Sequence, residues 1–440
     1  MSYDEMKISK LGDACCGCGA CAAKCPKSCI SMQEDKFGFL HPVIDAGACV
    51  GCHACESVCP ALGGGKCDEA LGIRWAKGKS SELLEASSSG GIFGLLAESV
   101  IADGGVVCGA AWADGCRRVE HVLVEDAASL DCVMRSKYVQ SRIGRGVYVG
   151  IRDAIRSGRR VLFAGTACQI AGLKRYLGKM GESSLLLTVD VICHGVPAPR
   201  LWSEWIDYKN SLRGSNVCDV NMRSKTTGWL SFSAMYEYIA EKDPSPNCES
   251  TIFNQDWYMK AFLANASLRP SCFMCPAKRS CGSDITLGDF WGFQGIHPEV
   301  DYSKGVSAVI CNTDKGIAAF QGIANSIDCG DATIEQVLAG NPSLVKSVAP
   351  YAKCDEFMAD LASRMGIEGL MAKYDFKSSL KQRVRGKLGA IKRKVLKVAR
   401  EGIRWRHATG SCKRCESPPL RARFVYVVPR GSTRQPARCS

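Results

Sequence analysis

The sequence predicts a mixed fold of the α+β and α/β classes, in three parts that differ in composition. Residues 1–66 hold two dense runs of cysteine and end at a flexible break, Gly63-Gly64-Gly65. Residues 67–376 alternate apolar strand-like runs with helical patterns, which is typical of an α/β body with a partly parallel sheet. Residues 377–440 carry 19 Lys and Arg against 2 Asp and Glu, and so form a separate basic tail.

The two cysteine runs predict two [4Fe–4S] clusters. Each run has the spacing C-x2-C-x2-C-x3-C followed by proline, which is the pattern of bacterial two-cluster ferredoxins. The runs are Cys15, Cys18, Cys21 and Cys25, then Cys49, Cys52, Cys55 and Cys59. Since the fourth cysteine of each run ligates the other cluster in that pattern, we expect Cys59 on the first cluster and Cys25 on the second. Cys16 and Cys29 fall outside the spacing. The alternative is structural zinc, which usually shows separated C-x2-C pairs.

The elements after the first run follow in chain order. Residues 29–32 and 37–40 are predicted as short strands that flank a turn. Residues 87–91 form a Ser-Ser-Ser-Gly-Gly turn before an apolar stripe at helical spacing, and 106–112 are predicted as a strand. The stripe consists of Phe93, Leu96, Ala97 and Val100. A glycine-rich turn that enters a helix presents free N–H groups to a phosphate, and the alternative is an ordinary capped helix.

A strand–helix–strand unit follows, and we expect the body to divide before it, into 67–158 and 159–376. Residues 160–164 and 185–192 are predicted as buried parallel strands. Cys168 stands just past the first strand and Cys193 ends the second. Ligands of open parallel sheets bind at the carboxyl ends of strands, so the two thiols are expected to converge. A third C-x2-C pair, Cys272 and Cys275, comes later in the chain.

Composition limits the remaining classes. The chain has 440 residues, 27 of them cysteine, and a net charge of +13. Outside the tail, 38 basic residues meet 42 acidic ones, so the basic excess is weak grounds for nucleic-acid binding. The first ten residues have no apolar region, and no apolar run approaches the ~18 residues of a membrane helix. We therefore expect a reducing, cytoplasmic setting in which cysteine binds metal.

The basic tail is predicted to begin with an amphipathic helix. Over 377–406, apolar residues recur at three- and four-residue steps, and Lys and Arg fill the rest. Such a helix would dock on an anionic membrane surface or an acidic partner, or pack on the acidic body. Residues 407–440 are expected to lack fixed structure. Residues 428–432 have the appearance of an engineered protease site, and are excluded from the fold prediction.

Six segments of the body, in this order, resemble the beta-subunit family of the coenzyme F-420 hydrogenases and dehydrogenases. Plant 7-hydroxymethyl chlorophyll a reductase is similar to the same family. The resemblance runs from about Ala70 to about Gly316, behind a ferredoxin unit that is common in the family. The segments are Ser89-Gly90-Gly91, residues 136–141, residues 165–169, Cys193-His194-Gly195, Arg269-Pro270-Ser271-Cys272 with Cys275, and residues 284–292.

The resemblance implies an oxidoreductase that contains FAD and iron–sulfur clusters. It implies flavin contacts at Ser89, Gly90, Gly91, Ser136, Lys137, Tyr138 and Gln140. It implies a third [4Fe–4S] cluster on Cys168, Cys193, Cys272 and Cys275. Two departures matter: the family usually has proline where Ala167 stands, and the extra Cys281 leaves the choice among Cys272, Cys275 and Cys281 open.

Three functions are therefore compared. The first is a flavoprotein that exchanges a hydride with a deazaflavin and passes single electrons to clusters and a redox partner protein; Lys137 would stabilise the reduced flavin. The second is an electron-transfer subunit without its own catalytic site, and flavin content separates the two. The third is a zinc-stapled nucleic-acid-binding protein, which an iron-to-zinc count would test.

Overall fold

The structure is a computed structural model that describes residues 7–65, 69–240 and 243–376. By its contacts the chain divides into two units, Met1–Tyr374 and Asp375–Ser440. The predicted basic helix over 377–406 and the tail over 407–440 lie outside the described residues. Within the described ranges, no helix is both long and apolar enough to cross a membrane.

The N-terminal unit is built on a short hairpin and two small helices. Strands β1 (Ile30–Glu34) and β2 (Leu40–Ile44) pair in antiparallel register, which confirms the predicted strands on either side of a turn. The second strand begins three residues later than predicted, because the Asp35 carboxylate accepts hydrogen bonds from the main-chain nitrogens of Phe37 (2.8 Å) and Phe39 (2.9 Å). These two bonds extend the turn to Phe39. The helices are α1 (Ala20–Lys24) and α2 (Ala54–Ser57).

A nine-stranded sheet forms the centre of the body, in the order β14-β3-β13-β12-β8-β7-β4-β5-β6. Strands β12, β8, β7 and β4 run parallel to one another, which confirms the predicted partly parallel sheet. The carboxyl ends of β7, β8 and β12 therefore meet at one edge. The strands are β3 (Gly72–Gly78), β4 (Val106–Ala113), β5 (Arg118–Val124), β6 (Ser141–Arg142), β7 (Val161–Gly165), β8 (Leu186–Val191), β12 (Ile285–Asp289), β13 (Ser307–Cys311) and β14 (Ile327–Asp331).

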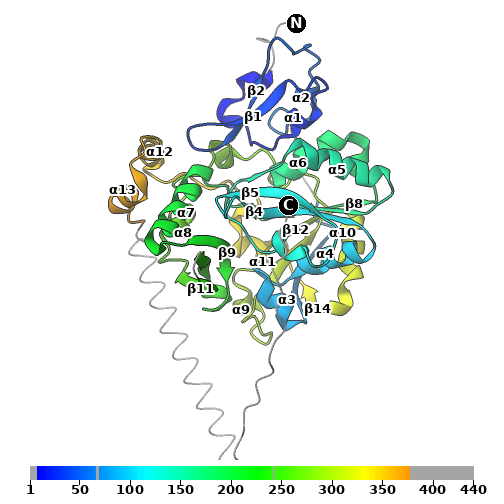
Figure 1. The fold of residues 1–440 in the computed structure, drawn as a ribbon. Coiled ribbons are helices and arrows are strands. Elements are labelled where there is room, and N and C mark those ends of the chain that lie inside the picture. Colours follow the sequence, from blue (N-terminus) through cyan, green and yellow to red (C-terminus); the bar gives the residue numbers. More distant parts are fainter. Residues whose placement is uncertain (1–6, 66–68, 241–242, 377–440) are drawn as a thin grey trace, which may run out of the picture. The chain divides into compact units, whose positions relative to one another are not determined.

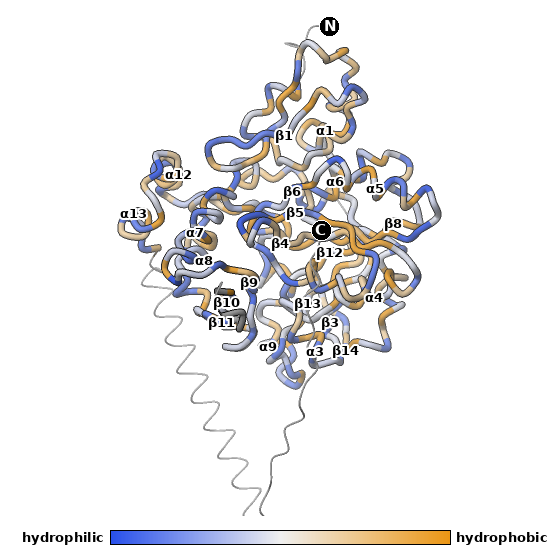
Figure 2. Tube along the Cα trace, viewed as in Figure 1, coloured by the Kyte–Doolittle hydropathy of each residue, from blue (hydrophilic) through white to orange (hydrophobic). Residues whose placement is uncertain are grey.

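Helices cover both faces of this sheet, and its central strands are mainly hydrophobic (Figures 1 and 2). Along β7, Val161 and Phe163 belong to one hydrophobic core and Leu162 to the other, because successive side chains of a strand alternate between faces. Helices α5 (Arg145–Arg156) and α6 (Ala167–Leu177) contribute to the first core. Helices α4 (Ile92–Ala102) and α10 (Asp314–Gly322) contribute to the second.

A second, antiparallel sheet of three strands carries an aromatic cluster. Its strand order is β11-β10-β9. The Trp202 ring of α7 packs against the Tyr258 ring of α8, with 4.7 Å between the ring centroids. The Trp205 indole donates a hydrogen bond to the Tyr236 hydroxyl (2.9 Å). The elements are β9 (Asn216–Ser224), β10 (Ser233–Ala240), β11 (Asp243–Ile252), α7 (Pro199–Arg213) and α8 (Trp257–Leu263). The remaining helices are α3 (Ser81–Ala86), α9 (Phe293–Ile296), α11 (Ile334–Gly340), α12 (Cys354–Ala362) and α13 (Gly366–Lys373).

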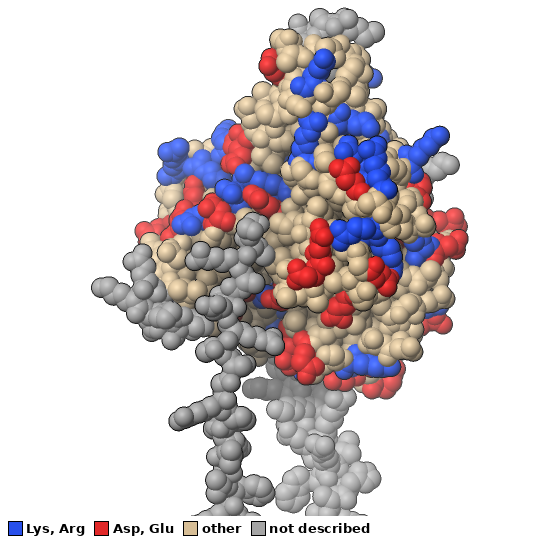
Figure 3. Space-filling model, turned by 45° about the vertical axis from the view of Figure 1, so that its right-hand side comes forward, with Lys and Arg blue, Asp and Glu red and all other residues tan. Residues whose placement is uncertain are grey.

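Charged side chains of both signs are interspersed on the surface. Figure 3 shows blue basic and red acidic groups side by side over the face it presents. Several of these are ion pairs, such as Arg159 with Glu125 at 2.9 Å and Arg160 with Asp103. This mixture agrees with the nearly balanced charge of the chain outside its tail.

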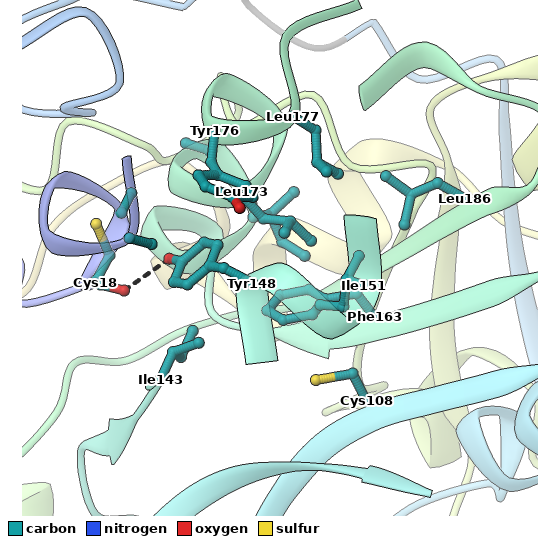
Figure 4. Close-up of a cluster of buried hydrophobic side chains, with 14 of the residues drawn as sticks. Cys18, Cys108, Ile143, Tyr148, Ile151, Phe163, Leu173, Tyr176, Leu177 and Leu186 are labelled. Atoms are coloured by element: carbon teal, nitrogen blue, oxygen red, sulfur yellow. Dashed lines mark hydrogen bonds between the residues drawn. The ribbon is translucent and has the colours of Figure 1, made fainter. Parts of the chain in front are cut away.

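The N-terminal unit shares a hydrophobic core with the body. Figure 4 shows Cys18 beside Tyr148 of α5 and Leu173 of α6, and the Tyr148 hydroxyl donates a hydrogen bond of 2.7 Å to the Cys18 carbonyl. The contact is close because α6 has Gly172 here. A Cβ added at Gly172 would lie 3.0 Å from the Cys18 sulfur.

We predict that Gly172→Val lowers the melting temperature, because overpacking a filled core costs roughly 1–3 kcal/mol. The control is Gly146→Val on α5, where an added Cβ would meet nothing within 4 Å. Thermal unfolding followed by circular dichroism measures both. Equal melting temperatures for the two variants would show that the contact with Cys18 is loose.

Candidate functional site

The cysteines of the N-terminal unit gather in two groups. Cys25, Cys49, Cys52 and Cys55 line one small cavity, which is the set expected for the second cluster. Cys29 lines the same cavity, and its sulfur lies 3.4 Å from that of Cys25. Sequence reasoning set Cys29 aside because it does not fit the spacing. Cys52 is exposed, so this group reaches the protein surface.

The other group lies deeper. Cys15, Cys18, Cys21 and Cys59 are all buried. Burial, followed by the charges of Cys15 and Cys59, raises the pKa of Cys21 to about 12. The effect of Cys59 on Cys21 indicates that Cys59, the fourth cysteine of the second run, lies near the first run. This agrees with the expectation that Cys59 belongs to the first cluster. Thiols of this kind become metal ligands only when a bound cation removes their protons.

The four cysteines of the body that were predicted as cluster ligands line one cavity at the carboxyl edge of the parallel strands. Cys168 lies in the first turn of α6 after β7, and Cys193 lies two residues after β8. Cys272 and Cys275 come from the short 3-10 helix Pro270–Met274 and the residue after it. Burial, and then the charges of Cys272, Cys168 and Cys275, raise the pKa of Cys193. The predicted convergence of these loops is therefore present.

Local sequence explains how Cys168 is positioned. Thr166 is the N-cap of α6 and forms a capping box with Gln169, so the helix begins at Ala167. Ala167 occupies the first helical position, where proline is also well tolerated. The departure from the family pattern thus leaves the helix start unchanged. The Thr166 hydroxyl lies 3.2 Å from the Cys168 sulfur.

Two further cysteines lie close to the cavity. Cys281 does not line it; its sulfur donates to the Asp190 carboxylate (3.7 Å) and packs in the core of the body. Cys16 does line it, together with Cys168. The geometry therefore favours Cys272 and Cys275 over Cys281 as cavity residues. It also brings the N-terminal cysteine loop to the cavity wall.

The donor set of this cavity suits an iron–sulfur cluster. Thiolate is the usual ligand of such clusters. Four cysteines from three loops of the body line one cavity, and Cys16 of the N-terminal unit is a fifth. Across the described ranges, no three His, Cys, Asp or Glu side chains are grouped as for a single metal ion. A cubane spreads its thiolates over four irons, so its ligands stand farther apart than those of one ion.

The Ser-Gly-Gly turn is held mainly by the protein itself. The Ser89 hydroxyl donates to the Val306 carbonyl (3.0 Å), and the Gly90 N–H donates to the Ser307 hydroxyl (3.0 Å). A Cβ on Gly90 would lie 2.4 Å from the Ala76 carbonyl oxygen, which explains the glycine. Gly91 begins α4 as its N-cap with φ of 81° and no side-chain cap. Only this end of the turn is left to face a ligand.

The predicted flavin residues 136–138 pack beside the serines that precede this turn. The Ser136 N–H donates to the Ser88 hydroxyl (2.8 Å), and the Lys137 amine donates to the Met134 carbonyl (2.7 Å). Gln140 lies elsewhere. Its amide donates to the Cys16 carbonyl (3.0 Å), and it lines the cysteine cavity. The sequence prediction had grouped Gln140 with the flavin residues, whereas its contacts are with the N-terminal cysteine loop.

Arg223 lies at the centre of this second region, and sequence reasoning missed it. Its guanidinium is buried, forms an ion pair with Asp289 (2.9 Å) and donates to the Tyr138 hydroxyl (3.3 Å). Its Nε atom and the nearby Ser87 hydroxyl are buried without a hydrogen-bond partner. Unsatisfied buried polar groups are costly, so they mark a place for ligand oxygens. The sequence feature that could have pointed to Arg223 was Asp289, because a carboxylate at the end of a buried strand needs a basic partner.

Aromatic rings connect the two regions. The Tyr138 ring stacks on Phe262 at 4.8 Å between centroids, and Phe262 meets the His194 ring edge-on at 5.2 Å. His194 follows Cys193 directly in the chain. A series of three rings, His194, Phe262 and Tyr138, thus leads from the cysteine cavity to Arg223.

Comparisons with known proteins agree with this arrangement. Residues 158–335 match the family model for the C terminus of the coenzyme F420 hydrogenase/dehydrogenase beta subunit, and residues 14–62 match that of the 4Fe-4S dicluster domain. No curated protein matches significantly. Among solved structures, a chain in a xenon-derivatised F420-reducing [NiFe] hydrogenase complex from Methanosarcina barkeri matches at 18% identity and a TM-score of 0.42. That match covers 69% of this chain and 95% of the other. The predicted resemblance is confirmed over these segments: residues 158–335 are related to F420 hydrogenase/dehydrogenase beta subunits, and residues 14–62 are a ferredoxin-type domain of the 4Fe-4S dicluster family.

We predict that Lys137 makes the stability of the protein rise with pH. Burial lowers the pKa of Lys137 to about 8 in the folded chain, against an ordinary value of 10.5. Between these values the unfolded state binds more protons, so unfolding becomes less favourable as pH rises. Lys137→Met should therefore melt higher than the wild type at pH 7, and this advantage should shrink from pH 8 to 10.5. A constant difference in melting temperature would contradict the prediction.

Proposed function

We propose that this chain is an iron–sulfur flavoprotein oxidoreductase that moves electrons between a deazaflavin hydride donor, FAD, and [4Fe–4S] clusters. The observation that carries the proposal is the cavity where Cys168, Cys193, Cys272 and Cys275 meet. Cys16 of the N-terminal loop also lines it, and the series of three rings that begins at His194 leads from it to the Arg223 region. The matches to an F420-linked family and a dicluster domain support the same reading.

The four cavity cysteines are the proposed ligands of a third cluster. They come from the ends of two parallel strands and from a C-x2-C loop, so the sheet edge fixes their separation. Lys278 lines the cavity as well, and its amine donates to the Cys193 carbonyl (2.7 Å). This cation partly offsets the repulsion among the thiolates.

The Arg223 region is the proposed flavin site. FAD, when bound, supplies the exchange between a two-electron hydride and single electrons. The Arg223 Nε and the Ser87 hydroxyl are buried donors without protein acceptors, and α4 begins without a side-chain cap. A pyrophosphate offers acceptors to donors of this kind. Tyr138 stands on the side nearest the cavity. Lys137, with its lowered pKa, is the proposed cation for the reduced flavin.

The experiment that tests the function is an anaerobic assay with a reduced deazaflavin and a one-electron dye. Each hydride carries two electrons, so one deazaflavin oxidised should reduce two dye molecules. The activity should require both FAD and the clusters. Purified protein that holds its full iron but binds no flavin would support a simple electron-transfer subunit instead.

We predict that Cys193→Ala lowers the iron content by about four atoms, because one cubane holds four, while FAD stays bound. Dye reduction should fall sharply. The matched control is Cys281→Ala, which removes a buried thiol near the cavity that does not line it, and should keep the wild-type iron. Iron, zinc and flavin are quantified in anaerobically purified protein. Equal iron in both variants would contradict this ligand set, and stoichiometric zinc with negligible iron would contradict the proposed clusters.

We predict that Ser87→Ala weakens FAD binding about fivefold, because one hydrogen bond is worth roughly 1 kcal/mol. It should not destabilise the flavin-free protein, since the Ser87 hydroxyl has no protein partner to lose. The control is Ser88→Ala, which loses the hydrogen bond from Ser136 and should lower the melting temperature. Flavin fluorescence titration and thermal unfolding measure both effects. Unchanged FAD affinity in Ser87→Ala would remove this hydroxyl from the flavin site.

A further inference from the structure

Arg269 is a buried cation whose guanidinium donates hydrogen bonds to two main-chain carbonyls and one amide oxygen. Only 1% of the residue is exposed. Its Nε donates to the Cys15 carbonyl (2.7 Å), one terminal nitrogen donates to the Gln140 side-chain oxygen (3.1 Å), and the other donates to the Leu40 carbonyl (2.8 Å). That last nitrogen also lies 3.3 Å from the His41 ring. The His41 ring is a second cation here, because Asp35 and then Cys15 raise the pKa of His41 to about 9. In the described chain, no carboxylate pairs with Arg269.

Such an arrangement needs a negative charge from elsewhere. An arginine does not lose its proton in a protein, and burying a charge without a counter-charge is costly. Arg223, another buried guanidinium, has Asp289 at 2.9 Å. On the Arg269 side, the Asp35 carboxylate faces His41 (3.5 Å) rather than the guanidinium. The groups left around Arg269 are thiols.

These thiols belong to both sides of the interface between the N-terminal unit and the body. The Arg269 Nε donates to the Cys15 carbonyl of the first run (2.7 Å), and Arg269 lines the same cavity as Cys168 and Cys272. Its main chain also shapes the cavity loop, because the Cys272 N–H donates to the Arg269 carbonyl (2.8 Å). Arg269 therefore stands between two sets of prospective cluster ligands.

We propose that Arg269 is a shared counter-ion that raises the reduction potentials of the cluster on Cys15 and of the cluster on Cys168 and Cys272. The second half of this statement rests on the third cluster proposed above. Adding one electron to a cluster adds one negative charge, and a fixed nearby cation stabilises that charge. Because the guanidinium has a planar set of five donors, it also binds the Cys15 and Leu40 carbonyls at the same time.

The test compares the midpoint potential of each cluster, together with iron content, in anaerobic full-length protein. Potentials are measured by redox titration followed by electron paramagnetic resonance. Arg269→Gln should lower the equilibrium constant for reduction of the Cys15 cluster at least tenfold. For a one-electron couple this is a fall of about 59 mV in its midpoint potential. Arg269→Lys keeps the charge and should shift it less. The control is Arg160→Gln, which removes a surface cation paired with Asp103 and should shift neither potential.

If Arg269→Gln does not assemble its clusters, Gln140→Glu tests whether the charge at Arg269 sets the cluster potentials. It keeps Arg269 and puts a carboxylate where the amide oxygen now accepts its hydrogen bond, so it should lower the potentials in the same direction. Full iron with unchanged potentials in Arg269→Gln or Gln140→Glu would overturn the proposal. Wild-type protein with only eight irons would refute the third cluster, while a shift of the Cys15 cluster would still support Arg269 as its counter-ion.

Discussion

The main-chain carbonyls of the N-terminal cysteine loop need hydrogen-bond donors, and the body supplies three of them. Arg269, Gln140 and Tyr148 donate to the carbonyls of Cys15, Cys16 and Cys18. All three donors are buried, so these bonds are protected from water and leaving any of the carbonyls unpaired would be costly. This requirement fixes the loop against α5 and α6. It also brings Cys16 to the wall of the second cysteine cavity.

The parallel strands impose the other constraint. Strands β7, β8 and β12 end at one edge, so a residue that follows any of them is brought near the others. Cys168 and Cys193 follow β7 and β8 at this edge and line the cysteine cavity. Asp289, at the end of β12, forms an ion pair with Arg223. The sheet thus positions both candidate centres, and the His194, Phe262 and Tyr138 rings lead from one to the other.

Local patterns explain what the sequence could predict. The strands at β7 and β8, the helix start at Thr166 and the mixed sheet follow from apolar periodicity and capping, which involve near neighbours. The three-stranded sheet of β9 to β11 was not predicted, nor were the roles of Arg223 and Arg269. The hydrogen-bond partners of these two guanidinium groups lie 66 or more residues away in the chain, so no local pattern reveals them. The contact of Gln140 with the Cys16 carbonyl was not predicted either, since the two residues are 124 positions apart. The ligand and flavin assignments themselves remain predictions.

The shared core around Cys18, Tyr148 and Gly172 has a consequence for kinetics. A carrier domain on a flexible tether must swing and dock before each transfer, and its rate then depends on linker length and viscosity. Here the N-terminal unit is packed against α5 and α6 like any other layer of the protein. Electron movement within the chain therefore needs no such search. The exposed Cys52 leaves one proposed cluster ligand of this unit at the protein surface.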